Sequence, residues 1–304
     1  MRSRHRSTVR TRSGVALAGA SRGYPLTGIS ARGGLVKTAL VLAALNTDGV
    51  ARVNGVLDPC TARKTLAYVN ERLRIALQET KDDIVASKRD DLMIMDDFSM
   101  SNEKTIRLRR FGNVLSSANR YDLMLSPSDG PVRDALGQVL SVLHPTFSAC
   151  LGDGADLFEL GALISDQGAS PQPLHPDTRH VVGEGPAVLT AFVALQSITK
   201  SMGPTFFLPG THNAEDHAAF NAVGPEALLA SHASWLGEIG PGDVTLYDSR
   251  VLHRGGANSS PNRRVLFYVS FKAAGAVAGT GTLFECLRGK HTLAECAQWS
   301  RSSR

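Results

Sequence analysis

The chain has 304 residues, of which 42% are hydrophobic and 20% are charged, with 29 glycines and 14 prolines. This composition excludes wholesale disorder and a collagen-like repeat, because it supplies enough apolar side chains for a core. The best apolar run, residues 35–45, contains Lys37 and falls short of the ~20 residues that a membrane-spanning helix needs. The sequence therefore predicts a globular protein with no membrane span.

The net charge of +5 is distributed unevenly along the chain. Residues 1–47 contain eight basic side chains and no acidic one, which leaves 25 basic against 28 acidic residues in the remainder. A nucleic-acid-binding protein should carry its basic patch on the folded body, so we expect no nucleic-acid partner. A Ser-, Thr- and Arg-rich leader over residues 1–34 is typical of a transit peptide and predicts a mitochondrial or plastid location. A disordered basic tail on a cytoplasmic protein is the alternative.

The first half of the body is predicted to be mainly helical. Residues 35–46 form a short helix, and residues 50–53 form a strand. Asp58-Pro59 then begins a helix, since Asp is a good N-cap and Pro fits the first helical position. Apolar residues follow at helical spacing as far as Leu77. Residues 80–120 are highly charged and are predicted to be loop and lid material. A further helix runs from Pro131 to His144-Pro145.

From Leu157 onward, short β-prone runs alternate with glycine and proline. Many short strands separated by turns indicate a sandwich or barrel rather than alternating β and α units. The predicted strands are residues 157–164, 188–195, 205–208, 244–247 and 265–271. One inserted helix is expected over 214–233 and a last one over 291–299. Residues 35–304 are predicted to form a single domain, with helices in 35–150, a β core in 151–272 and a C-terminal tail in 273–304.

The candidate chemistry begins at His175-Pro176-Asp177. Two residues apart on an extended chain, His175 and Asp177 point to the same face. With a second histidine they would complete a two-histidine, one-carboxylate triad, which leaves positions open at an oxygen-activating Fe(II). Alone, this pattern is a weak signal, because a histidine beside a Pro-Asp turn is common.

Two later segments supply the missing partners. A Gly-Asp turn at 242–243 leads into a β run that ends at His253, followed by Gly255-Gly256. In the strand that follows, alternation places Arg264, Leu266, Tyr268 and Ser270 on one face and Val265, Phe267, Val269 and Phe271 on the other. An inward-pointing Arg264 would need an anion, and a dicarboxylate offers a bidentate partner.

Together these pieces resemble the phytanoyl-CoA dioxygenase branch of the Fe(II)/2-oxoglutarate-dependent oxygenases. The segment Met202 to His212 looks like the "G-P-…-P-G-[ST]-H" stretch of that branch, and residues 242–264 are similar to it as well. The resemblance covers about residues 36–299 and is strongest over 150–272. It implies a mainly β fold with flanking helices, whose core is a double-stranded β-helix, or cupin-like jelly-roll.

The resemblance also implies the site residues. His175, Asp177 and His253 would bind iron, and Arg264 would bind the distal carboxylate of the cosubstrate 2-oxoglutarate, with O2 as the oxidant. Because Asp177 is present, where halogenases of the superfamily carry a small residue, hydroxylation is the expected chemistry. Gly255 departs from the pattern, since the family often has a serine two residues after the distal histidine.

Further residues are weaker candidates. Arg120 and Gln172 are predicted to add cosubstrate contacts, and Arg179 and His180 to face the substrate. The other histidines are predicted to have packing or surface roles: His212 braces a Pro-Gly turn, and His217 and His232 fall in the inserted helix. A second lid segment is expected at 178–187.

The leading hypothesis is a dioxygenase that hydroxylates a small organic molecule while 2-oxoglutarate is decarboxylated to succinate. A non-catalytic protein that binds metal and 2-oxoglutarate is one alternative, although such a protein would be expected to have lost a key side chain. A cupin-like metalloenzyme that does not use 2-oxoglutarate is another, and Arg264 argues against it. The sequence leaves the oligomeric state open.

Overall fold

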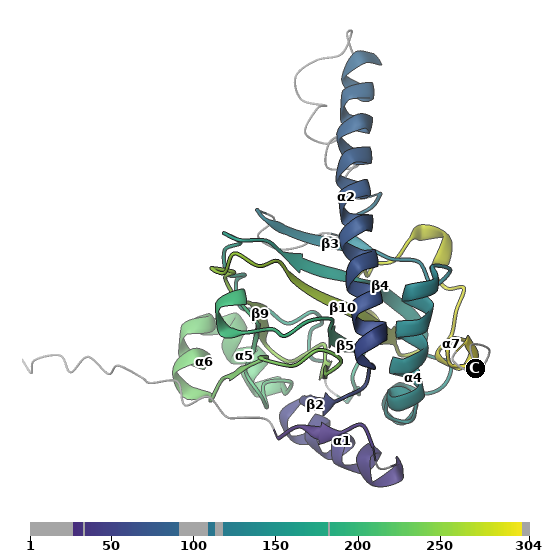
Figure 1. Ribbon diagram of the computed structural model, residues 1–304. Coiled ribbons are helices and arrows are strands. Elements are labelled where there is room, and N and C mark those ends of the chain that lie inside the picture. Colours follow the sequence, from purple (N-terminus) through teal and green to yellow (C-terminus); the bar gives the residue numbers. More distant parts are fainter. Residues whose placement is uncertain (1–26, 33, 91–108, 113–117, 182, 300–304) are drawn as a thin grey trace, which may run out of the picture.

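The computed structural model describes residues 27–32, 34–90, 109–112, 118–181 and 183–299 (Figure 1). Its β core consists of two sheets. The larger sheet has the order β1 (Ile29–Ser30), β2 (Val50–Asn54), β8 (Val244–Asp248), β5 (Val188–Ala194), β10 (Arg264–Lys272), β4 (Asp156–Ser165) and β3 (Arg120–Met124). The smaller sheet has the order β7 (Trp235–Leu236), β6 (Thr205–Phe207) and β9 (His253–Gly255).

Strand neighbours are antiparallel except for β1 and β2, which run parallel. The two sheets and their flanking helices form an open, β-rich core rather than a closed barrel, and this confirms the predicted fold class.

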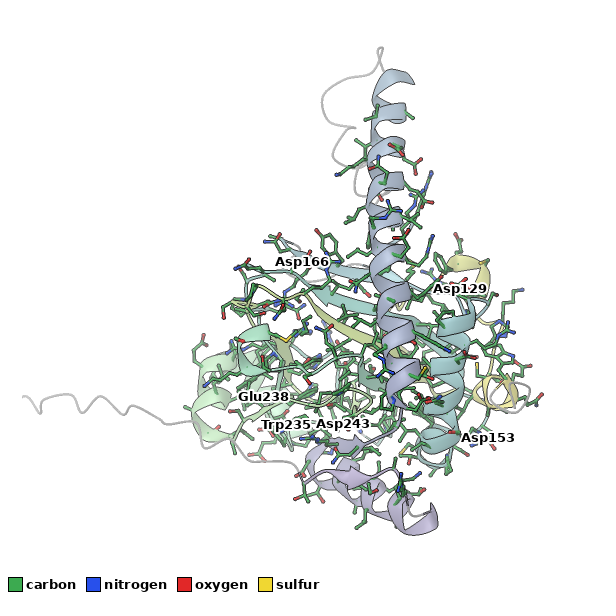
Figure 2. All side chains as sticks on the ribbon, in the orientation of Figure 1. Asp129, Asp153, Asp166, Trp235, Glu238 and Asp243 are labelled. Atoms are coloured by element: carbon green, nitrogen blue, oxygen red, sulfur yellow. The ribbon has the colours of Figure 1, made fainter. Side chains whose placement is uncertain are left out.

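Helices cover the outer face of the larger sheet (Figure 1). They are α1 (Gly34–Asp48), α2 (Pro59–Asp90), α4 (Gly130–Leu151) and, at the C-terminal end, α7 (Leu293–Trp299). Asp129 and Asp153 mark the two ends of α4 in Figure 2. Two further helices, α5 (Ala214–Val223) and α6 (Pro225–Ser231), lie beside the smaller sheet. None of the described helices combines the length and apolar character needed to cross a bilayer.

The two faces of β10 explain how the core and the site are separated. Val265, Phe267, Val269 and Phe271 belong to the large apolar core beneath the helices, where Phe271 packs edge-on against Phe147 of α4 at 5.2 Å. Leu266 and Tyr268 face the smaller sheet, in a second cluster that includes Phe207 and Trp235. The predicted alternation of this strand is therefore confirmed, and its inner face carries the polar residues discussed below.

The helix predicted from Asp58 forms as expected but runs further. Asp58 Oδ1 accepts hydrogen bonds from the backbone amides of Cys60 at 2.8 Å and Thr61 at 3.0 Å, as an N-cap should. Residues 80–90, predicted to be loop, continue the helix, and α2 projects beyond the body in Figure 1. Arg110 bridges Glu79 and Asp83, one turn apart, and this ion-pair network supports the extension.

Two other helix boundaries were predicted wrongly. Helix α4 continues through Pro145 to Leu151, although proline removes one helical hydrogen bond. The flanking residues Leu143 and Phe147 are fully buried, and their packing outweighs that loss. The single helix expected over 214–233 is split by Gly224, whose φ of 83° ends α5 before Pro225 begins α6.

Parts of the predicted leader and lid fall outside the described residues, namely 1–26 and 33 in the leader, 91–108 and 113–117 in the first lid segment and 182 in the second. Within the predicted leader, Ile29 and Ser30 form β1 and pair with β2. The larger sheet therefore includes residues that precede residue 35.

Candidate metal and cosubstrate site

The two predicted histidine ligands face each other across an antiparallel backbone pairing. His253 opens β9, and His175 forms an isolated β-bridge with it. The amide of each residue donates to the carbonyl of the other, at 3.0 and 2.9 Å. Their ring centroids lie 4.7 Å apart. Backbone pairing alone therefore brings these side chains together from distant parts of the sequence.

Both imidazole rings are oriented by the same kind of hydrogen bond. His175 Nδ1 lies 2.8 Å from the carbonyl of Pro173, and His253 Nδ1 lies 2.9 Å from the carbonyl of Val251. A carbonyl oxygen only accepts, so Nδ1 carries the proton in each ring and Nε2 keeps its lone pair. Burial and the neighbouring His253 lower the pKa of His175, which favours the neutral form that binds metals. These partners are the kind that orient metal-bound histidines.

Asp177 completes the set of donors. Its carboxylate oxygens lie 3.8 Å from His175 Nε2 and 3.6 Å from His253 Nε2. One ligand atom from each of the three residues falls within 4.8 Å of the others. Tyr247 donates its hydroxyl to Asp177 Oδ2 at 2.9 Å, and the Asp177 amide donates to the carbonyl of Ser249 at 2.8 Å. Two imidazoles and one carboxylate fit a divalent transition metal such as Fe(II).

The triad opens into a cavity of about 340 Å³ that extends along the inner face of the larger sheet. Arg264 lies in its wall with 2% of its surface exposed. Its guanidinium donates to the carbonyl of Gly203 and, at 3.2 Å, to the hydroxyl of Ser165, while its Nε has no hydrogen-bond partner. Burial and the adjacent Arg120 lower the pKa of Arg264 to about 9. A buried cation with neutral partners and an unpaired donor fits an anionic ligand.

Arg120 and Gln172, the two other residues predicted to contact the cosubstrate, differ in whether they line the cavity. Arg120 is 2% exposed and donates to the Ser165 hydroxyl at 2.8 Å and the Ser170 carbonyl at 2.7 Å. Arg120 and Arg264 are the register partners of Ser165 on its two sides, and Arg120 does not itself line the cavity. Gln172 does line it, and its Oε1 accepts from the Gly255 amide at 2.9 Å.

Gly255, the departure from the family pattern, now has a structural reason. A Cβ at this position would lie 2.5 Å from Gln172 Oε1 and 2.9 Å from Arg120 Nη1. The space that a serine side chain would occupy is taken by these two residues.

The weaker candidates lie apart from the cavity. Arg179 is exposed and His180 is half-buried, and neither lines the cavity. His212 Nε2 contacts the Asn46 carbonyl at 3.3 Å, which braces the loop against the end of α1. His217 bonds to the Arg250 carbonyl at 2.8 Å, and His232 contacts Asp216 at 3.3 Å. These three histidines have the packing roles that were predicted.

Part of the cavity wall was not predicted from the sequence. Asp122, Glu159 and Tyr247 line it, as does a segment of the C-terminal tail that includes Gly281 and Thr282. Glu159 carried a usable signal, because it is a lone acidic residue within an otherwise apolar predicted strand. The C-terminal tail has no sequence signal of this kind, because its contact with the cavity is determined by the tertiary fold.

Comparison with known proteins places the chain in a family. The model of the phytanoyl-CoA dioxygenase (PhyH) family matches residues 45–266, so the chain belongs to this family. No curated protein matches the sequence. The cofactor set of the family is Fe(II), 2-oxoglutarate and O2, and the described donors fit it.

Solved structures show the same fold at low sequence identity. The non-heme alpha ketoglutarate dependent epimerase SnoN from nogalamycin biosynthesis is 18% identical, with a TM-score of 0.55 over 79% of this chain and 84% of that one. The complex of the epimerase SnoN with Fe3+, alpha ketoglutarate and nogalamycin RO is 19% identical, with a TM-score of 0.54 over 80% of this chain and 86% of that one. AviO1 from Streptomyces viridochromogenes Tue57 is 18% identical, with a TM-score of 0.51 over 80% and 98%.

Proposed function

We propose that this member of the family is a dioxygenase that hydroxylates a small organic substrate, with oxidative decarboxylation of 2-oxoglutarate to succinate and CO2. One observation carries the proposal: a two-histidine, one-carboxylate triad lines the same cavity as a buried arginine whose Nε has no hydrogen-bond partner. In the overall balance one atom of O2 enters the substrate and the other enters succinate.

The proposed roles follow from the contacts. His175, Asp177 and His253 would hold Fe(II), which supplies the oxygen-activating chemistry when bound. The carbonyls of Pro173 and Val251 hold the proton on Nδ1 of each ring, which would leave Nε2 available to bind the metal. Arg264 would bind the distal carboxylate of 2-oxoglutarate.

The key side chains also distinguish the proposed function from the two alternatives. A metalloenzyme that uses no 2-oxoglutarate would have no reason to bury the Arg264 guanidinium in the cavity wall, where its charge is costly. A non-catalytic relative would be free to lose a donor, and this chain keeps all four side chains. The carboxylate of Asp177 supports hydroxylation over halogenation, because it occupies the position that a halide would need.

The test is a visible spectrum under anaerobic conditions. Adding Fe(II) and then 2-oxoglutarate should produce a metal-to-ligand charge-transfer band, which should be absent in His175→Ala and weakened in Arg264→Ala. Exposure to air should then release succinate. A folded, iron-loaded protein that gives no band would overturn the assignment.

The acid-free leader supports a second proposal, that residues 1–34 direct the protein to a mitochondrion or plastid. A fluorescent fusion should change location when residues 1–28 are removed, a truncation that keeps β1. An unchanged diffuse signal would favour the cytoplasmic alternative.

A further inference from the structure

The proposed function leaves two acidic side chains of the cavity without a role. Asp122 of β3 and Glu159 of β4 both line it. Within the described part of the chain, neither forms an ion pair with a lysine, arginine or histidine. Asp122 is buried and Glu159 is half-buried. Carboxyl groups that are withdrawn from water without a cation are costly, and such groups concentrate at functional sites.

Neutral groups hold both carboxyls in place. Asp122 accepts hydroxyl hydrogen bonds from Tyr268 at 2.6 Å and Thr282 at 2.7 Å. Glu159 accepts from the Ser270 hydroxyl at 2.6 Å and from the Thr282 amide at 3.3 Å. Each carboxylate oxygen therefore receives one such bond and has capacity for another.

The position of Glu159 relative to the triad suits a substrate. Glu159, Ser270, Thr190 and Tyr247 are register partners on four neighbouring strands, β4, β10, β5 and β8. Ser270 bonds to Glu159 at 2.6 Å and to Thr190 at 2.9 Å, and Tyr247 at the far end bonds to Asp177. A group seated against Glu159 would therefore lie on the same row of the sheet as Tyr247, whose hydroxyl bonds to the carboxylate of the triad.

Arg264 lies at the other end of the same face. It is six residues from Ser270 along β10, about 20 Å at the usual rise per residue. If 2-oxoglutarate occupies the Arg264 end, as the proposed function requires, the end next to Glu159 is left for the substrate.

The charges of the cavity indicate what that substrate carries. With Fe(II) at +2, 2-oxoglutarate at −2, Asp177 at −1 and the buried Arg264 and Arg120 at +1 each, the proposed site carries +1 before Asp122 and Glu159 are counted and −1 when both of these carboxyls are charged. Burial and the charge of Asp177 raise the pKa of Glu159 to about 8, and burial raises that of Asp122 to about 6. Their surroundings therefore lack a positive charge that a ligand could supply.

We propose that the substrate is a small molecule with a protonated amine, and that Glu159, assisted by Asp122, is the specificity-determining residue that binds this ammonium group. The inference rests on the proposed function for the position of the metal and cosubstrate. It adds the substrate class to that function.

The probes are matched pairs of amine and alcohol: cyclohexylamine with cyclohexanol, benzylamine with benzyl alcohol, and phenethylamine with phenethyl alcohol. Binding is measured by calorimetry on the full chain, loaded anaerobically with Fe(II) and 2-oxoglutarate. We expect at least one amine to bind about tenfold tighter than its alcohol, a difference of ~1.4 kcal/mol. If no amine binds, or if the alcohols bind equally well, the inference is wrong.

Glu159→Gln keeps the shape of the side chain and removes its charge. It should abolish the amine preference while changing alcohol binding less than about twofold. Glu226→Gln removes the same charge from exposed α6 and should leave the preference intact. A Glu159→Gln protein that still prefers the amine would refute the role of Glu159.

A measurement on the unaltered protein guards against a variant that fails to fold. The comparison of each amine with its alcohol is made on the wild-type protein, so it does not depend on whether a variant folds. Equal affinities of the wild-type protein for amine and alcohol would contradict the inference. The charge-transfer band is recorded before any probe is added, so a missing band identifies failure of the proposed function instead.

Discussion

Replacing Arg264 with methionine should separate ligand binding from stability. The change removes a buried cation and keeps a long apolar side chain. It leaves the Gly203 carbonyl without its present donor, a loss of about 1–3 kcal/mol. Against this, the pKa of Arg264, lowered to about 9, signals a burial penalty of about 1.4 kcal/mol per pH unit of depression. The relief of this burial penalty is at least as large as the lost hydrogen bond, so the free energy of unfolding without ligands should not fall.

The ligand response should behave differently. At a 2-oxoglutarate concentration of 100 times its Kd, binding should stabilise the iron-loaded wild-type protein by ~2.7 kcal/mol. Arg264→Met should lose this response at the same concentration, because the distal carboxylate would meet an apolar side chain. Urea unfolding under anaerobic conditions, with and without 2-oxoglutarate, measures both quantities.

Arg263 provides the matched control. It points away from the cavity and pairs with Asp166, at the edge of the body in Figure 2, through two hydrogen bonds of 2.5 and 2.9 Å. Arg263→Met should lose about 0–1 kcal/mol of stability and keep its full 2-oxoglutarate response. The reasoning is refuted if Arg264→Met is severely destabilised without ligands yet still responds fully to 2-oxoglutarate.

Three other predictions follow from the site. Gly255→Ser should weaken 2-oxoglutarate binding by less than about tenfold (~1.4 kcal/mol) in calorimetry, because it would push aside the flexible ends of Gln172 and Arg120. Tyr247→Phe should lower Fe(II) affinity by about 10-fold in a competition titration with a chelator, since Asp177 loses its hydroxyl donor. Without ligands, the contribution of Glu159 to stability should fall as pH rises from about 4.5 to 8. Over that range folded Glu159 keeps a proton that the unfolded chain has released, and Glu159→Gln should flatten the profile in urea titrations.

Each of these has its own control or contrary outcome. Gly154→Ala adds a methyl group where no atom lies within 4 Å and should leave 2-oxoglutarate binding unchanged. Tyr121→Phe removes a hydroxyl outside the cavity and should bind Fe(II) as the wild type does. A stability that rises across pH 4.5 to 8 in the wild type, but not in Glu159→Gln, would reverse the sign expected for a buried carboxyl group.

The elements predicted best are those whose pattern coincides with burial. The alternation along β10 was readable because its outer residues pack under helices and its inner residues face the cavity. The helix ends were less predictable, because tertiary packing decides them. The packing of Phe147 against Phe271 stabilises the part of α4 that follows Pro145. Arg110, which is distant in sequence, stabilises the end of α2 through its ion pair with Asp83.

The site residues also fall into two groups, those that the local sequence predicts and those that only the tertiary fold brings together. His175 and Asp177 are neighbours in sequence, so their common direction could be inferred before any fold was known. Asp122 lies near Thr282 only because the C-terminal tail folds back onto β3. No local pattern carries such a contact, and the substrate end of the cavity was therefore missed.

The backbone pairing of His175 with His253 has a consequence for how this protein can change over evolution. Reciprocal amide–carbonyl bonds position the two histidines, and the third donor, Asp177, lies outside that pairing with 39% of its side chain exposed. Substituting Asp177 would therefore leave a two-histidine half-site in place within an intact fold. New metal chemistry could arise by a single exchange at position 177, without the chain first having to rebuild its core.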